Sequence, residues 1–338
     1  MPADTLSGPI DERVAEYLRR SNLAPAATRV EPLHGDASSR AYVRIAPPGR
    51  PPVVLALHPE PFAPGSLPQI VVGSIFRRLG IPIPAVLDEA ADLGILAVED
   101  LGDETLQSWM AGSADRAPAP LYREAIGYLA ALQTRGEPLR DEGALPFTIA
   151  FDAAKLTWEL DFFRSEFLGA HRRVTLSLAE TAALGGELSA IAEDLAAEPR
   201  VLCHRDYHCR NLMVRDGRLV VIDFQDARLG PGTYDLVSLL RDCYVDLPDE
   251  LTAALTRRFL DAVPAQRTGD FQARFDLMSV QRHLKALGTF GHQVARLGRE
   301  HFAEPVPRTL AYLRRALRAC PRFARLRELL APHVPELG

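Results

Sequence analysis

The sequence predicts an α+β fold with two lobes, a small β-rich N-terminal lobe and a larger, mostly helical C-terminal lobe, with a cleft between them. Three observations support this prediction. Strand-like apolar runs gather before residue 103, helical periodicity dominates after it, and a polar segment that contains glycine, Glu99–Asp103, separates the two parts. We therefore expect the lobe boundary at 102/103, with lobes at 1–102 and 103–338.

The N-terminal lobe is predicted to contain two helices and four strands. Apolar residues recur at helical spacing between Ile10 and Leu18, which indicates an amphipathic helix that ends near Asn22. A second helix is expected over Leu67–Leu79, because the proline-rich segment Ile81–Pro84 cannot continue it. The expected strands are Thr28–Leu33, Ala41–Ile45, Val53–Leu57 and Leu93–Val98.

The C-terminal lobe is predicted to be helical except where strands carry a polar loop near residue 206. The segment Ala111–Pro120 contains two prolines and is expected to be a surface loop. Apolar residues recur at helical spacing through most of the remaining chain. The expected helices are Thr105–Met110, Leu121–Gln133, Phe151–Phe167 and, approximately, 177–197, 233–244, 249–262, 272–297 and 306–331.

Composition limits the classes of function. The 338 residues are 47% hydrophobic, which is enough for a large core, and no apolar run approaches the length of a membrane span. Four scattered cysteines, none in a Cys-x-x-Cys pair, indicate a reducing cytoplasm without disulfides, and the first residues lack the apolar stretch of an export signal. A net charge of −5 argues against a nucleic-acid partner. Only two of the 39 basic residues are lysines, Lys155 and Lys285.

Residues 204–226 contain two acids and an amide at informative positions. Asp206 is followed by four residues and then by Asn211, the spacing of a catalytic loop whose Asp receives the proton of a substrate hydroxyl and whose Asn holds a metal ion. Asp223 ends an apolar strand. This pattern predicts an Mg-ATP-dependent phosphotransferase.

The spacing also predicts a hairpin that brings the amide and the second acid together. Its strands are Asn211–Val214 and Leu219–Ile222, and Asp216 and Gly217 make the turn. Asn211 and Asp223 then lie beside each other at one end. Such oxygen ligands suit Mg²⁺, which completes its shell with water and phosphate oxygens.

A zinc site competes for the same loop, because Cys203, His204, His208 and Cys209 are nominal ligands within seven residues. Structural zinc usually takes ligand pairs from two separate segments, and the chain has no second Cys/His pair. We therefore expect His204 to brace the loop through the backbone and Cys203 to lie in the core.

At this point a resemblance to a family becomes clear. The chain resembles the aminoglycoside/choline phosphotransferase family of protein-kinase-like small-molecule kinases through the segments Leu33–Ile45, Leu96–Thr105, Cys203–Asn211, Val221–Asp226 and Gly232–Asp235. A narrower set looks like the bacterial cell-wall-recycling kinases, which phosphorylate N-acetylmuramate and N-acetylglucosamine at the anomeric hydroxyl: Gly35–Ser38, His204–His208, Asp223–Ala227, Gly232–Asp242 and Leu284–Gly288.

The resemblance implies roles for individual residues. Asp206 would orient and deprotonate the sugar hydroxyl, Arg210 would neutralise charge on the transferring group, and Asn211 and Asp223 would hold Mg²⁺ across the ATP phosphates. Asp235 is expected to tie a helix start to the catalytic loop. The implied nucleotide contacts are the phosphate-covering turn with Asp36, Ser38, Ser39 and Arg40, and the backbone of Glu99–Leu101 at the adenine edge.

One departure concerns the lysine that the family commonly carries on its third strand to bind the α- and β-phosphates. The segment Val53–His58 has none, and no lysine precedes Lys155. The remaining candidates for this cation are Arg44, our first choice, Arg40 and His58. Weaker nucleotide binding, with a pseudokinase scaffold as the extreme, is the alternative.

The acceptor is inferred from charge. N-acetylmuramate brings a lactyl carboxylate, so a basic group is expected to face it, and aromatic side chains are expected to stack on the sugar ring. The basic candidates are Arg241, Arg282, His283 and Lys285, and the aromatic ones are Trp158 and Phe162. A kinase for an aminoglycoside or a choline-like hydroxyl remains the alternative, and no obligate protein partner is evident.

Overall fold

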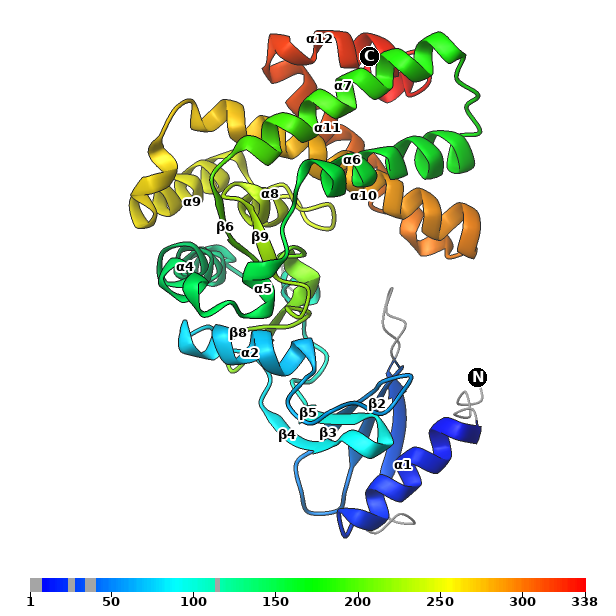
Figure 1. Ribbon diagram of the computed structural model, residues 1–338, viewed down its shortest axis with the longest axis vertical. Coiled ribbons are helices and arrows are strands. Elements are labelled where there is room, and N and C mark those ends of the chain that lie inside the picture. The colour runs from blue at the N-terminus through cyan, green and yellow to red at the C-terminus, as the bar shows by residue number, and fades with distance from the viewer. Residues whose placement is uncertain (1–7, 24–27, 34–40, 113–115) are drawn as a thin grey trace.

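The computed structural model describes residues 8–23, 28–33, 41–112 and 116–338. It shows the expected α+β architecture, with a small sheet-containing lobe below a large helical lobe in Figure 1. The predicted phosphate-covering residues Asp36, Ser38, Ser39 and Arg40 lie outside the described residues.

The N-terminal lobe is built on a five-stranded antiparallel sheet of order β1-β2-β3-β5-β4. Its strands are β1 (Arg29–Leu33), β2 (Ala41–Ala46), β3 (Val53–Leu57), β4 (Val86–Ala90) and β5 (Ile95–Glu99). The four predicted strands are confirmed. Strand β4 was not predicted, because Asp88 and Glu89 interrupt its apolar pattern; it is an edge strand with a register shift between Val86 and Asp88.

Two helices flank this sheet. Helix α1 (Gly8–Arg20) packs Tyr17 and Leu18 against Val43 and Ile45 on one face. Helix α2 (Pro68–Arg78) lies between the sheet and the C-terminal lobe (Figure 1), where its Phe76 ring meets Phe224 at 5.3 Å. Apolar contacts therefore join the two lobes directly behind the cleft.

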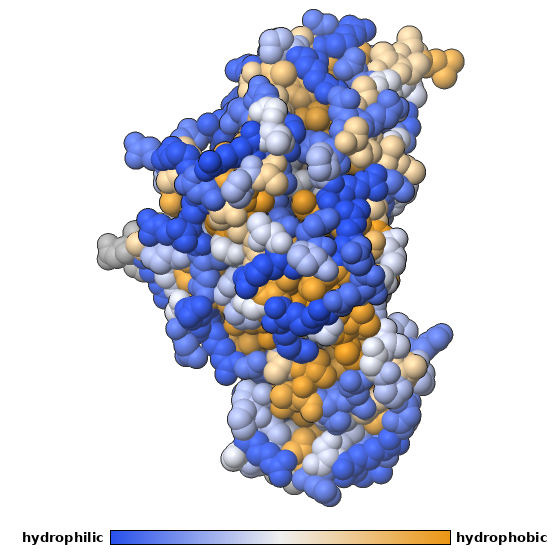
Figure 2. All heavy atoms as spheres, turned by 60° about the vertical axis from the view of Figure 1, so that its left-hand side comes forward, coloured by the Kyte–Doolittle hydropathy of each residue, from blue (hydrophilic) through white to orange (hydrophobic). Residues whose placement is uncertain are grey.

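Glycine allows close packing at one position of this junction. A Cβ at Gly73 of α2 would stand 3.1 Å from Ile83 and 3.3 Å from Phe224, so these side chains would have to shift by a few tenths of an ångström. Figure 2 shows hydrophobic residues gathered on this side of the molecule around the level where the lobes meet. None of the described helices is both long enough and apolar enough to span a bilayer.

The C-terminal lobe contains the remaining helices, and most agree with the predictions. They are α3 (Leu106–Ala111), α4 (Ala119–Gly136), α5 (Leu145–Thr148), α6 (Ala153–Phe162), α7 (Leu178–Ala197), α8 (Tyr234–Leu240), α9 (Asp249–Ala262), α10 (Phe271–Leu297), α11 (Val306–Ala319) and α12 (Ala324–Leu330). Helix α4 begins inside the expected loop 111–120, at its last two residues.

Two predicted helices are divided. The helix expected over 306–331 ends at Ala319, because Pro321 cannot donate to the helical ladder, and α12 begins at Ala324. The helix expected over 151–167 becomes α6 followed by a π-helical segment, Phe163–His171. The backbone of α10 packs closely here, since a Cβ at Gly288 would stand 2.8 Å from the Phe163 nitrogen.

Two short antiparallel pairs of strands carry the polar loop. Strand β6 (Arg200–Cys203) pairs with β9 (Arg228–Pro231), and β7 (Leu212–Arg215) pairs with β8 (Arg218–Val221). The β7–β8 turn consists of Asp216 and Gly217, both with positive φ, as a tight hairpin turn requires. The predicted hairpin is therefore confirmed, with strand ends that differ by one residue.

Candidate functional site

The open end of the hairpin holds Asn211 and Asp223 side by side, as predicted. The Asn211 amide nitrogen donates to Asp223 Oδ2 at 3.4 Å and to the Asp206 carbonyl at 2.8 Å. Gln225 Nε2 donates to Asp223 Oδ1 at 2.7 Å. Because the amide nitrogen makes both Asn211 bonds, the amide oxygen could serve as a metal ligand beside the exposed Asp223 carboxylate.

Buried polar groups fix the loop that carries Asp206. His204 Nε2 bonds the Ile222 carbonyl at 2.9 Å, so the ring braces the loop on the backbone as expected. The Asp235 carboxylate accepts from the backbone nitrogens of His204 at 2.6 Å and Arg205 at 3.0 Å. Arg205 has a φ of +90°, a conformation that such anchoring stabilises. The predicted structural role of Asp235 is confirmed.

The four nominal zinc ligands have separate environments. The Cys203 thiol lies by the carbonyls of Val201 and Pro231, each at 3.6 Å. The His208 ring meets Tyr244 edge-on at 5.4 Å, and burial lowers the pKa of His208 to about 3. Within the described ranges, no three His, Cys, Asp or Glu side chains are grouped to hold a metal.

The Asp206 carboxylate is surrounded by cations. Lys285 Nζ donates to Oδ1 at 2.9 Å, and Arg282 Nη1 stands 3.9 Å from the same atom. Arg205 Nε stands 3.7 Å from Oδ2. Burial raises the pKa of Asp206, but Lys285, Arg205 and Arg282 outweigh it and hold this pKa well below its usual range. Asp206 is therefore ionised, and Oδ1 is occupied by Lys285.

Five basic side chains form what we call the cationic basin. Lys285, Arg282 and Arg205 face the Asp206 carboxylate, Arg228 contacts Asp226, and Lys155 is coupled electrostatically to Arg205, Arg228 and Lys285. Helices α6 and α10 meet beside the basin, where Gln281 Nε2 donates to Glu159 Oε2 at 2.8 Å. Both lysines of the chain belong to the basin. Lys155, Glu159 and Gln281 were not identified from the sequence, although the scarcity of lysine was a usable signal.

Only some of the basic residues predicted to bind the acceptor, which lie on α10 or just after α8, face Asp206. Lys285 and Arg282 face Asp206, and Arg282 also donates to the Tyr234 hydroxyl at 2.9 Å. Arg241 does not join them, because it lies 3.7 Å from Asp249 and over the Tyr312 ring.

His283 is likewise turned away from the basin. Its Nδ1 lies 2.5 Å from the Ser279 carbonyl and its Nε2 2.9 Å from the Arg241 carbonyl. Burial lowers the pKa of His283 to about 4, so the ring is neutral. Arg241 and His283 therefore support the packing of α10, and the structure does not bring them to the Asp206 carboxylate.

The aromatic candidates Trp158 and Phe162 form a stack on α6. Their ring centroids are 5.5 Å apart, and Trp158 is 56% exposed. Phe162 also contacts the His292 ring at 5.4 Å. The catalytic candidate Arg210 lies over the Tyr244 ring, 4.7 Å from its centroid.

Arg44 lies at the hinge end of the sheet. Arg44 of β2 lies opposite Val54 of β3, and Val54 lies opposite Val98 of β5. Val98 stands one residue before the hinge. The Arg44 guanidinium lies 2.6 Å from Asp100 and 2.8 Å from Asp103. These carboxylates engage Arg44 at the hinge end of β3, so its role as the phosphate-binding cation stays a prediction that requires it to leave them.

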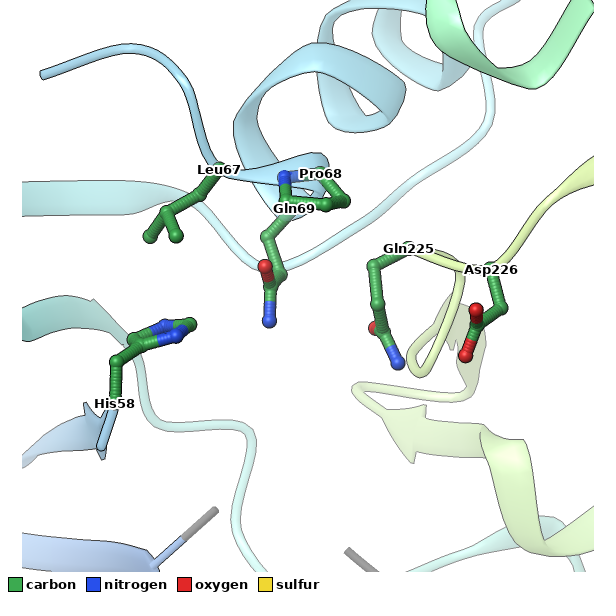
Figure 3. Close-up of a pocket in the computed structure, with 6 residues that line it drawn as sticks. All are labelled: His58, Leu67, Pro68, Gln69, Gln225 and Asp226. Atoms are coloured by element: carbon green, nitrogen blue, oxygen red, sulfur yellow. The ribbon is translucent and has the colours of Figure 1, made fainter. Parts of the chain in front are cut away.

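The opposite end of β3 opens into a cavity of about 250 Å³ between the lobes. It is lined by His58, Leu67, Pro68, Gln69, Gln225 and Asp226, and Figure 3 shows Gln69 and Gln225 pointing into it. Gln225 also bonds the predicted metal ligand Asp223. The polar groups near this metal position therefore come from both lobes.

The hinge connects the lobes through side chains and backbone. The Glu99 carboxylate bonds Arg215 of β7 and accepts from the Ala85 nitrogen at 3.2 Å. Val214 donates its N–H to the Glu104 carbonyl at 2.8 Å. Leu101 lies between the residues that make these contacts, Glu99 and Glu104, and is half-buried. The predicted adenine contact at Glu99 and Leu101 thus falls on a braced segment.

A model of the phosphotransferase enzyme family matches residues 29–271. The chain belongs to this family. Similar solved structures include the aminoglycoside phosphotransferase APH(2'')-Ib, ADP-bound (TM-score 0.55, 15% identity, 92% of this chain and 98% of that chain). Choline kinase from Cryptosporidium parvum is also similar (TM-score 0.59, 11% identity, 94% and 99%). These phosphotransferases share the two-lobed kinase fold of the chain.

Curated relatives of this phosphotransferase share one name, N-acetylmuramate/N-acetylglucosamine kinase. The relative from Neisseria meningitidis serogroup B is 34% identical over 80% of this chain and 80% of its own length. The one from Pseudomonas aeruginosa is 34% identical over 89% and 87%. The one from Caulobacter vibrioides is 30% identical over 98% of both chains. The similarity therefore extends across both lobes.

Proposed function

We propose that this phosphotransferase is an ATP-dependent kinase that transfers phosphate to the anomeric hydroxyl of N-acetylmuramate, N-acetylglucosamine or both, and forms the sugar 1-phosphate in cell-wall recycling. The observation that carries the proposal is the ionised Asp206, set beside the Asn211–Asp223 pair and held by Lys285. The shared name of relatives that cover 80–98% of the chain supports the choice of sugar.

The residues present fit Mg-ATP. Asn211 and Asp223 offer an amide oxygen and a carboxylate at the open end of the hairpin, and these are ligands that Mg²⁺ prefers. When bound, Mg-ATP supplies the phosphoryl group with part of its charge neutralised. Glu99 and Leu101 are proposed to meet the adenine. Arg210 is proposed to lie near the transferring group.

Asp206 is proposed to orient the sugar hydroxyl and to receive its proton at Oδ2. Lys285 occupies Oδ1 and so fixes the plane of the carboxylate. A carboxylate with a lowered pKa is a weak base, but it suffices where the transition state is loose and the hydroxyl needs little activation. An anomeric hydroxyl is more acidic than an ordinary alcohol, which suits this base.

The charge of the site disfavours the alternative acceptors. Aminoglycosides and choline are cations, whereas Lys285, Arg282 and Arg205 stand within 4 Å of the Asp206 carboxylate, and Arg205 and Arg228 contact Asp226. A pseudokinase has no use for all three of Asp206, Asn211 and Asp223. A reducing cytoplasm, where both sugar and ATP are available, is the compartment we propose, and the four cysteines are free thiols.

A coupled assay for ADP release tests the proposal over N-acetylmuramate, N-acetylglucosamine, their methyl glycosides, choline and gentamicin. We expect turnover with one or both free sugars, none with the methyl glycosides, and an anomeric phosphate by ³¹P NMR. A 6-phosphate product, or turnover with the methyl glycosides, would remove the anomeric assignment. Preferential turnover of choline or gentamicin would contradict the amino-sugar kinase itself.

A further inference from the structure

Lys155 differs from the other members of the cationic basin in its partners. Lys285 and Arg282 face Asp206 at 2.9 and 3.9 Å. Arg205 and Arg228 both contact Asp226, at 3.0 and 3.4 Å. For the Lys155 ammonium, no carboxylate lies within 4 Å among the residues that the structure describes. Within the described part of the chain, an ammonium group that feels the charges of Arg205, Arg228 and Lys285 is therefore without a direct counter-ion.

Neighbouring residues of α6 hold both the backbone and the ammonium group of Lys155 in place. The residue lies on the first turn of α6, whose backbone is capped by the Asp152 side chain at 2.7 Å. Its Nζ is held 3.9 Å from the centroid of the Trp158 ring, one turn further along. Trp158 in turn stacks on Phe162. The ammonium is thus kept on an aromatic surface instead of extending into solvent.

The energetics favour an anion at this position. Burial lowers the pKa of Lys155. The nearby charges of Arg205, Arg228 and Lys285 lower this pKa further, and the charge of Glu159 raises it only in part. Gln281 donates to Glu159 Oε2, and among the described residues the Glu159 carboxylate makes no ion pair with the Lys155 ammonium. A ligand carboxylate would relieve this like-charge repulsion, and charge-assisted hydrogen bonds in partly desolvated sites are strong.

We infer that Lys155 binds the carboxylate of the acceptor, the lactyl group of N-acetylmuramate, with Trp158 as the apolar wall beside it. This inference rests on the proposed function and adds the residue that distinguishes the two sugars. N-acetylglucosamine has no lactyl group and leaves Lys155 unused. Lys155 is therefore a specificity determinant, whereas Asp206 and Lys285 serve both sugars.

The test is Lys155→Met, which keeps the apolar stem and removes the charge. We expect KM for N-acetylmuramate to rise about 10- to 100-fold, as for the loss of a hydrogen bond to a charged group, with kcat little changed. The kcat/KM for N-acetylglucosamine and the KM for ATP should stay within about twofold. Lys155→Arg should restore most of the N-acetylmuramate affinity.

Arg164→Gln is the matched control, since Arg164 follows α6 and is paired with Asp161 at 2.9 Å on the surface. It should leave both sugars unaffected. An equal loss with both sugars in Lys155→Met would assign Lys155 to packing, and a rise in KM for ATP would assign it to phosphate; either overturns the inference.

Calorimetric titration with each sugar separates this inference from the proposed function. If wild-type protein binds N-acetylmuramate and Lys155→Met loses that binding selectively, the inference stands even where turnover is absent. If wild-type protein phosphorylates N-acetylmuramate and the variant binds and uses it equally well, only the inference fails. If wild-type protein neither binds nor phosphorylates either sugar, both fail.

Discussion

The cations of the two lobes differ in how they are neutralised. In the N-terminal lobe, Arg44 is held by two hinge carboxylates, Asp100 and Asp103, and its side chain is 15% exposed. In the C-terminal lobe, four basic side chains of the basin share two carboxylates among the described residues, Asp206 and Asp226, and Lys155 contacts neither. A strand arginine is thus neutralised at the hinge, while we propose that the basin keeps positive charge available for ligands.

The comparison shows what residue type alone leaves open for Arg44. The missing third-strand lysine made Arg44, on the neighbouring strand, the first candidate for the phosphate-binding cation, but cross-strand register decides which end of the strand it faces. Val54 and Val98 place it by the hinge. To judge whether a basic side chain can bind phosphate, both its counter-ions and its position along the strand must be known.

The largest effect is expected from Asp206→Asn, which removes the carboxylate that the basin surrounds. The substitution keeps the shape but loses the proton acceptor, so turnover should fall by about 10²–10⁴-fold. Mg-ATP binding, measured by calorimetry, should be retained, because Asn211 and Asp223 are unchanged. Near-wild-type turnover would remove Asp206 from its role, and lost nucleotide binding would show that it acts on the metal side.

How much of this site could be predicted depends on distance along the chain. Asn211 and Asp223 flank one hairpin and Asp206 lies in the loop directly before it, so a turn at Asp216 and local spacing sufficed to bring them together. The same holds for the predicted strands, whose apolar runs are local signals. Edge strand β4 escaped prediction because exposed acids interrupt its pattern.

The basin is a tertiary feature that local patterns do not encode. Lys155 on α6 and Lys285 on α10 are separated by most of the C-terminal lobe, and the packing of these helices brings them to one site. Helical periodicity predicted both helices but not which face meets Asp206. Arg241, one residue beyond α8, illustrates the limit, since it turns towards Asp249 and Tyr312 instead.

An intermediate effect is expected from Lys285→Met, which breaks the bond to Asp206 Oδ1 while leaving the base in place. We expect kcat to fall about 10-fold, since the carboxylate loses its orientation but not its basicity. Lys285 lowers the pKa of Asp206, so its removal should raise that pKa.

The sign of this change is testable in a pH profile. The base is active when ionised, so activity is lost as pH falls through the pKa of Asp206. A raised pKa moves this acid limb of kcat/KM to higher pH. An unchanged acid limb would show that Lys285 does not act on Asp206, and Lys285→Arg should restore most of the shift if it does.

The smallest effect on activity is expected from Arg44→Gln, and it tests the comparison most directly. Because the hinge carboxylates engage Arg44, the KM for ATP should change by less than about twofold. Stability should fall instead, since Asp100 is only 4% exposed and would lose its counter-ion. We expect a loss of about 1–3 kcal/mol in unfolding free energy, below the cost of breaking a fully buried pair because Asp103 is exposed.

Arg29→Gln is the matched control for this prediction. Arg29 lies on the neighbouring strand β1, and its ion pair with Glu31, at 3.1 Å, has side chains that are 76% and 42% exposed. Exposed pairs contribute little, so urea titration should show no measurable change. A tenfold rise in KM for ATP in Arg44→Gln, at unchanged stability, would mean that Arg44 leaves Asp100 to bind phosphate. The N-terminal lobe would then supply ligand-directed charge as the basin does, and the contrast between the lobes would be wrong.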